Sequence, residues 1–401
     1  MPMRILVINS GSSSIKYELY QMPERTVEAT GLLQKIGEET SELKHKMRGN
    51  EVAVRRPVKD HAEGLKLIVD HLTDAAHGGL KAITEIGAVG HRVVHGGEAF
   101  AETALITDEV VKAIEDHVEL APLHNPPNLL GIRVARQLLP GVPQVAVFDT
   151  SFHQTMPEHA FIYAVPYDLY KENRVRRYGF HGTSHRYVAA RAAALLGKPL
   201  SEVNLITCHL GNGCSMAAIR AGRSVDTTMG LTPLEGLVMG TRCGDIDPAI
   251  IPYLERVRKL DVAQIDNLLN KKSGLLGLSG LSNDMRSVMK AEDEGNPRAA
   301  LALMIYCYRI KKYVGAYTAA LGTVSAVVFT AGVGENSAEI RRRVMSDLEQ
   351  LGYRLDHEKN RAAAGRETDI ATADSPSRIL VVPTDEELLI AQDTYELARV
   401  R

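Results

Sequence analysis

The chain twice combines a short strand, a polar turn that contains glycine, and a second strand. Residues 5–8 form an unbroken apolar run, residues 9–14 read Asn-Ser-Gly-Ser-Ser-Ser, and residues 15–19 alternate between apolar and polar. The same order of run, turn and run returns over residues 205–219. A buried run followed by an alternating one is typical of a hairpin at the start of a sheet. The repetition therefore predicts two related lobes with a cleft between them.

Strand-like runs alternate with amphipathic helices along the whole chain, which predicts an α/β fold. We expect helices near residues 62–76 and 297–321, a helix capped by Thr107, and a final helix capped by Thr384. The lobe boundary is expected near residue 150. The N-terminal lobe then comprises residues 1–150 plus 384–401, because the last helix can pack back on it, and the C-terminal lobe comprises residues 151–383.

Charge and composition exclude several classes of protein. The formal net charge of the 401 residues is -2, so no basic field points to nucleic acid or an anionic membrane. No apolar run approaches the roughly 20 residues that span a bilayer. Four cysteines without a C-x-x-C pair are typical of a reduced, cytoplasmic protein. The basic run of residues 341–343 is interpreted as a solvated helix face.

Three glycine-containing turns follow predicted strands, near Gly11, Gly211 and Gly332. Glycine lets backbone N–H groups approach an anion without obstruction by a Cβ atom. Neither G-x-x-x-x-G-K-[ST] nor G-x-G-x-x-G occurs. The turns therefore predict a nucleotide site of another kind, although each alone is an ordinary tight turn.

Two arginines stand between glycines: Arg92 in the run from Gly90 to Gly97, and Arg242 in Gly-Thr-Arg-Cys-Gly-Asp. A guanidinium can hold a carboxylate or a phosphate through two parallel N–H bonds. Two such groups at one cleft would neutralise a phosphoryl group in transfer. A surface strand with a salt bridge is the alternative for Arg92.

Other candidates are weaker when taken singly. Asn9 and Lys16 flank the first turn and fit a magnesium ligand and a phosphate contact, or only a shaped turn and a solvated lysine. Asp149 follows a strand, where α/β active sites usually lie, and His181 has a glycine beside it. Glu386 lies at the start of the last predicted helix, where its carboxylate either binds a metal or interacts favourably with the helix dipole.

Together these segments resemble the acetate kinase family. Residues 7–16 and 90–97 are similar to its two signature segments, and the similarity continues in family order through seven further segments: residues 121–128, 148–157, 177–185, 209–213, 240–247, 332–336 and 383–387. The resemblance implies the fold of acetate and sugar kinases, Hsp70 and actin, with two related ribonuclease H-like lobes of mixed sheets flanked by helices.

The resemblance also implies a homodimer that uses ATP and Mg²⁺, with Mn²⁺ as a substitute, to interconvert acetate and acetyl phosphate. By the same route, Asn9 and Glu386 correspond to the metal positions and Arg92 to an acetate contact. The implied catalytic positions are Asp149, His181, Arg242 and also Arg92. The implied methyl pocket consists of Val94, Leu123, Phe180 and Pro233. The implied nucleotide contacts are Lys16, His209, Leu210, Gly211, Asn212, Gly213, Asp284, Met285, Arg286, Gly332, Val333, Gly334, Glu335 and Asn336.

Acetate is already an anion at pH 7, so no strong base is required, and we expect Asp149 mainly to orient Arg92 or a metal-bound water. Two alternatives stay open. One is a propionate or butyrate kinase, because a methylene is worth only about 1 to 3 kcal/mol in a pocket. The other is a nucleotide-driven binding protein of the actin or chaperone type, since fold alone does not decide function.

Overall fold

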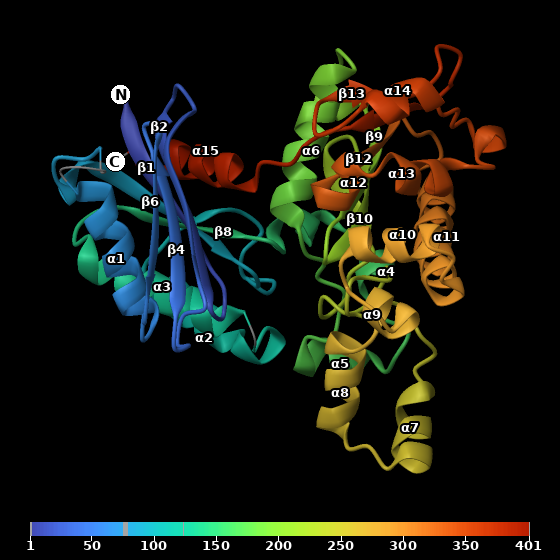
Figure 1. Cartoon of the computed structure of the whole chain (residues 1–401), viewed down its shortest axis with the longest axis horizontal. Helices are drawn as coiled ribbons and strands as arrows, with labels where there is room; N and C mark the ends of the chain where they lie inside the picture. The colour runs from blue at the N-terminus through green and yellow to red at the C-terminus, as the bar shows by residue number, and fades with distance from the viewer. Residues whose placement is uncertain (1, 75–78, 123, 401) are drawn as a thin grey trace. The chain divides into compact units, whose positions relative to one another are not determined.

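The structure is a computed structural model that describes residues 2–74, 79–122 and 124–400. The chain forms two compact units (Figure 1). Unit 1 comprises Met1–Phe152 and Asp385–Arg401, and unit 2 comprises His153–Thr384. None of the described helices is long and apolar enough to cross a membrane.

Unit 1 is built on a mixed sheet of eight strands in the order β5-β4-β3-β2-β1-β6-β8-β7. The strands are β1 (Met3–Ser10), β2 (Ser14–Met22), β3 (Thr26–Gln34), β4 (Ser41–Met47), β5 (Asn50–Arg56), β6 (Ile86–Val93), β7 (Ala104–Leu105) and β8 (Gln144–Phe148). The helices are α1 (His61–Thr73), α2 (Asp108–Asp116), α3 (Asn125–Leu138) and α15 (Glu386–Ala398), with short 3₁₀ turns at Ile83–Glu85, Val118–Leu120 and Ser151–Thr155.

Helices cover both faces of the central strands of unit 1. Alternate residues of β1 enter different cores: Leu6 and Ile8 pack with α1 and α3, whereas Ile5 and Val7 pack with α15. A strand that is buried on both faces is apolar without interruption, as residues 5–8 are. The last helix of the chain thus packs on the first strands (Figure 1).

Unit 2 contains a six-stranded sheet in the order β11-β10-β9-β12-β14-β13. Its strands are β9 (Asn204–Leu210), β10 (Cys214–Arg220), β11 (Arg223–Thr227), β12 (Ala326–Thr330), β13 (Thr368–Asp369) and β14 (Arg378–Val381). Its helices are α4 (Glu158–Phe161), α5 (Tyr167–Asn173), α6 (Gly182–Leu195), α7 (Ile250–Arg258), α8 (Val262–Lys271), α9 (Gly274–Ser279), α10 (Met285–Asp293), α11 (Pro297–Leu321), α12 (Ala331–Asn336), α13 (Ala338–Met345) and α14 (His357–Ala362), with 3₁₀ turns at Leu200–Glu202 and Glu349–Leu351.

The two sheets share one topology. In unit 1, β1 pairs antiparallel with β2 and parallel with β6, which pairs parallel with β8. In unit 2, β9 pairs antiparallel with β10 and parallel with β12, which pairs parallel with β14. Both sheets end in an antiparallel edge strand, β7 or β13. This shared order confirms the prediction of two related α/β lobes.

Local predictions had mixed outcomes. The helix at residues 297–321 and the Thr107 cap are confirmed, since Thr107 accepts a hydrogen bond from the Val110 amide. The cap predicted at Thr384 was wrong by one residue, because Asp385 accepts the bond from the Leu388 amide. The end predicted for the first helix, near residue 76, lies outside the described residues, and α1 ends at Thr73.

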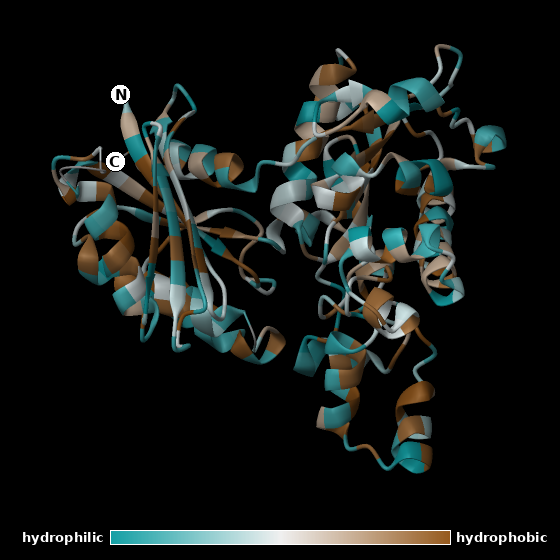
Figure 2. Cartoon of the chain, viewed as in Figure 1, coloured by the Kyte–Doolittle hydropathy of each residue, from teal (hydrophilic) through white to brown (hydrophobic). Residues whose placement is uncertain are grey.

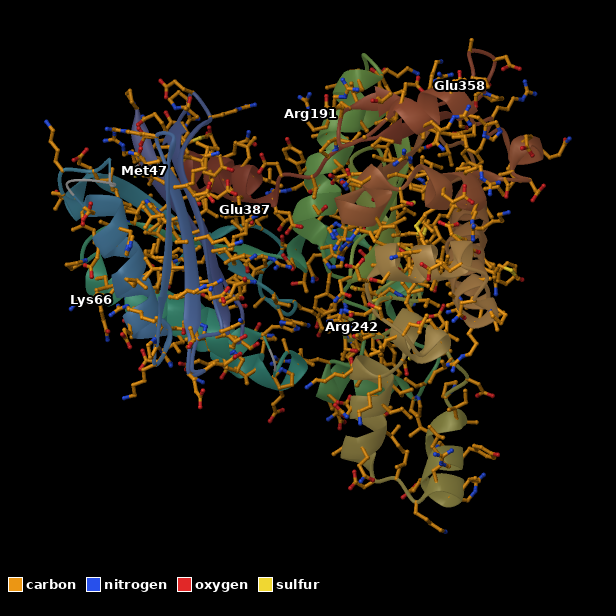
Figure 3. All side chains as sticks on the ribbon, viewed as in Figure 1. Met47, Lys66, Arg191, Arg242, Glu358 and Glu387 are labelled. Atoms are coloured by element: carbon orange, nitrogen blue, oxygen red, sulfur yellow. The ribbon has the colours of Figure 1, made fainter. Side chains whose placement is uncertain are left out.

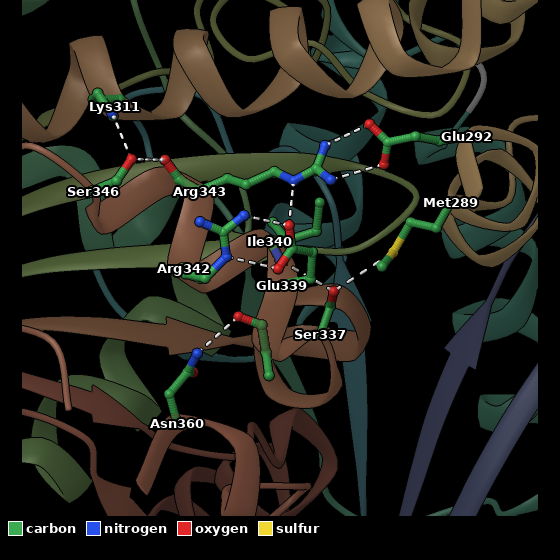
Figure 4. Close-up of polar contacts among 11 residues, drawn as sticks. Met289, Glu292, Lys311, Ser337, Glu339, Ile340, Arg342, Arg343, Ser346 and Asn360 are labelled. Atoms are coloured by element: carbon green, nitrogen blue, oxygen red, sulfur yellow. Dashed lines mark hydrogen bonds and ion pairs between the residues drawn. The ribbon is translucent and has the colours of Figure 1, made fainter. Parts of the chain in front are cut away.

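The prediction of a solvated helix face at residues 341–343 was wrong for Arg341. Arg342 and Arg343 pair with Glu339, and Arg343 also pairs with Glu292 (Figure 4). Arg341 instead has no exposed surface. Its five N–H groups bind the carbonyl oxygens of Gly334, Glu335, Asn360 and Ala363 and the side-chain oxygen of Asn360, at 2.8 to 2.9 Å.

Removing the Arg341 guanidinium is expected to destabilise unit 2. Arg341→Met leaves four buried carbonyl groups without these donors, so we expect the free energy of unfolding to fall by about 3 kcal/mol or more. Arg342 is half-exposed and pairs only within its own helix, so Arg342→Met should change that free energy by about 0.5 kcal/mol or less. Urea unfolding of both variants measures the contrast, and equal losses would contradict it.

Candidate active site

In unit 1, three neighbouring parallel strands end at one edge of the sheet. β1 ends beside β6, where Ile8 pairs with His91, and β6 ends beside β8, where Val93 pairs with Phe148. The Asp149 amide continues this ladder through a 2.9 Å bond to the Val93 carbonyl. Because carboxyl ends of parallel strands meet at one edge, Asn9, Arg92 and Asp149 belong to the same end of the sheet.

Arg92 and Asp149 form a bidentate ion pair at this edge. Arg92 Nε donates to Asp149 Oδ1 at 3.1 Å, and Nη2 donates to Oδ2 at 2.6 Å. The Asp149 side chain is 1% exposed and that of Arg92 is 22% exposed. Burial alone would lower the pKa of Arg92, but the charges of Asp149 and Glu386 raise it overall. The guanidinium is therefore charged and held in one orientation, with part of its surface open.

The first residues of α15 add acidic groups to the same edge. Glu386 Oε2 lies 3.7 Å from Arg92 Nε. Burial, Asp149 and Glu387 raise the pKa of Glu386 to about 7, although Arg92 opposes the shift. Lys16 is opposite Asn9 in the β1–β2 ladder, and its Nζ lies 2.6 Å from Glu387 Oε1.

In unit 2, His181 and Arg242 both lie close to Gly213 in the turn between β9 and β10. A Cβ atom built on Gly213 would lie 3.5 Å from Arg242 Nη1 and 3.6 Å from His181 Nε2. His181 precedes α6 with a φ of 56°, and its Nδ1 lies 2.8 Å from Ser215 Oγ. Its ring stacks on that of His209 with centroids 4.2 Å apart. The absence of a side chain at residue 213 thus leaves room beside two potential donors.

The Arg242 side chain is half-buried. Burial lowers its pKa, and no carboxylate among the described residues pairs with it. Its Nη1 makes a 3.4 Å bond to the Pro233 carbonyl. Figure 3 labels Arg242 in unit 2 and Glu387 on α15. A partly buried guanidinium with donors to spare is suited to an anionic ligand.

Hydrogen bonds join the two ends of the loop that carries Arg242, and sequence reasoning missed some of the residues that make them. The Gly236 amide donates to Asp245 Oδ1 at 2.8 Å, and the Asp245 amide donates to the Gly236 carbonyl at 2.9 Å. From α11, Arg309 donates to the carbonyl oxygens of Gly236 and Asp245, and Tyr313 donates to Asp245 Oδ2 at 2.8 Å. Arg309 and Tyr313 are distant in sequence and carry no motif, so only the fold reveals this role.

A cavity of about 880 Å³ lies next to the turn between β9 and β10 in unit 2. Its lining includes eight of the residues expected to contact nucleotide: Gly211, Asn212, Asp284, Met285, Arg286, Gly332, Val333 and Asn336. Two others have different surroundings. His209 is buried and its Nδ1 lies 2.8 Å from Ser184 Oγ, while Glu335 Oε1 accepts a 3.1 Å bond from the Thr384 amide.

The residues expected to form a methyl pocket fall in both units. Val94 in unit 1 is buried, as is Phe180 in unit 2. Pro233 is half-buried in the loop that precedes Arg242. Leu123 lies outside the described residues.

Comparison with known proteins agrees with this fold and these segments. A model of the acetokinase family matches residues 4–392. The chain is 60% identical over 396 residues to an acetate kinase from Halothermothrix orenii, with 98% of this chain and 99% of that protein covered. It is 53% identical over 395 residues to an acetate kinase from Clostridium botulinum, with the same coverage.

Two solved structures are similar over nearly their whole length. A crystal structure of Porphyromonas gingivalis acetate kinase has a TM-score of 0.95 and 49% identity, and one of a propionate kinase from Francisella tularensis has a TM-score of 0.92 and 43% identity. Each comparison covers 98% of this chain and 99% of the other. The family match therefore includes both units, and the chain belongs to the acetokinase family.

Proposed function

We propose that this protein transfers the terminal phosphoryl group of ATP to acetate, giving ADP and acetyl phosphate, in a reversible reaction. Membership of the acetokinase family supports the reaction type. The observation that carries the proposal is Arg242, a half-buried cation with no carboxylate partner among the described residues, beside His181 and the Gly213 turn. Such a group stabilises negative charge that develops on a phosphoryl group in transfer.

In unit 1, we assign binding of the acetate carboxylate to Arg92 and contact with the acetate methyl group to Val94. The ion pair with Asp149 supports a role for that carboxylate in orienting the guanidinium rather than in removing a proton. Acetate enters as an anion, because carboxylic acids of this kind have pKa values near 4. One acetate oxygen attacks the terminal phosphorus, the P–O bond to ADP breaks, and ADP leaves with its electron pair.

In unit 2, we assign the nucleotide to the 880 Å³ cavity and the adjacent turns, with His181 and Arg242 at the terminal phosphoryl group. Backbone N–H groups of the glycine turns approach the phosphates. This assignment makes unit 1 the acetate and metal side of the enzyme and unit 2 its nucleotide side.

Mg²⁺, for which Mn²⁺ can substitute, fits the oxygen-rich edge of unit 1, where Asn9 and Glu386 would hold it. Burial is the main cause of the raised pKa of Glu386, and the nearby carboxylates of Asp149 and Glu387 add to it. The described residues contain no group of three or more His, Cys, Asp or Glu side chains that could bind a metal by themselves. Mg²⁺ usually takes one or two protein oxygens together with substrate phosphates and water, so this donor set suits it. When bound, the ion neutralises phosphate charge.

ATP turnover with and without acetate tests the proposal against a nucleotide-driven binding protein. We expect ADP release to depend on acetate and to match the acyl phosphate formed, trapped as its hydroxamate. ADP release at the same rate without acetate would favour the binding protein, which does not need Arg92 and Arg242 as substrate contacts.

Acetate is expected to be preferred over longer acids. Val94 and Phe180 are buried, and an added methylene in a tight apolar site changes kcat/KM by roughly 10-fold or more. Comparison of kcat/KM for acetate, propionate and butyrate measures the preference. A kcat/KM for propionate equal to or above that for acetate would reassign the substrate. The likeness to a propionate kinase is the reason to include propionate in this comparison.

We further propose a cytoplasmic homodimer. Leu301, Met304 and Tyr308 project from α11 with 51%, 59% and 64% of their surface exposed. Helix α7, which has brown and teal segments in Figure 2, also exposes Ile250, Ile251 and Val257. Such side chains are suited to an interface with a second copy. The free thiols of Cys208, Cys214, Cys243 and Cys307 fit a reducing compartment. A solution mass near twice 43.8 kDa would support the dimer, and a mass of one chain would oppose it.

A further inference from the structure

Helix α3 begins with two buried asparagines, Asn125 and Asn128, to which the proposed mechanism assigns no role. Asn125 is 0% exposed and Asn128 is 4% exposed. Both side chains bind main-chain groups outside their own helix. Buried amides whose bonds go to the backbone of neighbouring segments hold that backbone in one position.

Asn128 connects the ends of two parallel strands. Its Oδ1 accepts from the Val94 amide at 3.0 Å, and its Nδ2 donates to the Ser10 carbonyl at 2.8 Å. The partners determine which way the amide faces, because the backbone N–H can only donate and the carbonyl can only accept. Ser10 ends β1 and Val94 directly follows β6, so one side chain ties the turn after β1 to the start of the proposed acetate pocket.

Asn125 binds the backbone of His95, the residue that follows Val94. Its Oδ1 accepts from the His95 amide at 3.2 Å, and its Nδ2 donates to the His95 carbonyl at 3.0 Å. Gly131, one turn beyond Asn128, brings α3 against β1, since a Cβ atom there would lie 2.5 Å from Ser10 Oγ. The backbone of Val94 is thus fixed by one asparagine directly and by the other through its neighbour.

We propose that Asn128 is a positioning residue that sets the selectivity of the enzyme for short acids by holding Val94 in place. This inference rests on the proposed function, in which Val94 packs against the methyl group of acetate. A pocket wall rejects an extra methylene only where it does not yield. The Val94 wall is held by the bond from its own amide to Asn128 and by the two bonds between Asn125 and the next residue. Loss of the bond from the Val94 amide gives the wall freedom to move, and longer acids then fit.

The test compares kcat/KM for acetate and propionate in the wild type, Asn128→Ala and Asn128→Asp. We expect the acetate-to-propionate ratio to fall by about fivefold or more in Asn128→Ala, since a methylene is worth roughly 10-fold or more in a rigid pocket. KM for ATP should stay within about twofold, because α3 belongs to unit 1 and the nucleotide cavity to unit 2. Asn128→Asp keeps the acceptor for Val94 but places an anionic oxygen against the Ser10 carbonyl, so a smaller fall is expected.

Ser41→Ala is the matched control, because it removes a similar bridge in the same unit. Ser41 is 1% exposed, donates to the Lys35 carbonyl and accepts from the Val58 amide. It should lower stability and leave the acid ratio unchanged, which separates positioning from general destabilisation.

The outcomes separate this inference from the proposed function. A wild type that makes no acyl phosphate refutes the function. A wild type that makes acyl phosphate, with an acid ratio in the folded Asn128 variants within about twofold of its own, overturns the role of Asn128 alone. Should Asn128→Ala not fold, the ratio in Asn128→Leu decides, because leucine also removes the acceptor for the Val94 amide at similar volume, and an unchanged ratio there overturns the role as well.

Discussion

Arg242→Ala is expected to lower kcat by roughly 10²-fold or more, as loss of a transition-state donor does in other enzymes. Arg242 is the strongest candidate for this effect because it is half-buried and no described carboxylate neutralises it. In the proposed mechanism its charge acts on the transferring phosphoryl group. Steady-state kinetics at saturating ATP and acetate measure the loss.

Two further substitutions make the Arg242 result specific. Arg242→Lys keeps the charge but loses the planar fork, so we expect an intermediate kcat. Arg191→Ala removes an exposed arginine of the same unit that pairs with Glu367, and kcat should stay near the wild-type value (Figure 3). A folded Arg242→Ala enzyme with a kcat within about threefold of wild type would remove Arg242 from the mechanism.

Asp149→Asn is expected to lower kcat by about 10²-fold, because the bidentate pair that orients Arg92 becomes a single neutral bond. The substitution preserves side-chain volume at a position that is 1% exposed. The loss should appear with acetate and propionate alike, since the proposed mechanism places Arg92 at the carboxylate and not at the alkyl chain.

The role of Asp149 as an orienting group, rather than a base, has its own signature. No proton moves when an acetate anion attacks phosphorus, so kcat in D₂O should stay within about 1.5-fold of its value in H₂O. Asp369→Asn, which alters an exposed pair with Arg378, is the control for loss of a carboxylate charge. Near-normal turnover by folded Asp149→Asn enzyme shows that Asp149 is dispensable, and a large isotope effect points to a base.

Sequence alone predicted the parts of the fold that have a local signal. The apolar run at residues 5–8 is continuous because helices cover both faces of β1, and the same reasoning holds for β9 and β12 in unit 2. Strands β3 to β5 were not predicted. Burial alternates strictly along β4, but its buried positions include Ser41 and His45, so the apolar alternation in the sequence is weak. Burial in β3 is irregular and β5 is largely exposed.

The site shows the same division between local and distant signals. Arg92 and Arg242 were noticed because glycines frame them, but the Arg92–Asp149 pair depends on the parallel pairing of β6 and β8. Arg341 looked like part of a solvated run because its neighbours are charged. Its burial follows from carbonyl groups of α12 and α14 that no local pattern reveals. Asn128 likewise acts on Ser10, which is 118 residues away.

The central claim is that an acetate oxygen attacks the phosphorus of the transferred phosphoryl group, and oxygen labelling tests it most closely. With acetate carrying ¹⁸O in both carboxyl positions, the oxygen that bridges carbon and phosphorus in acetyl phosphate must come from acetate. We predict an isotope shift of the acetyl phosphate signal in the ³¹P NMR spectrum. Acetyl phosphate that forms without labelled oxygen on phosphorus would contradict the account.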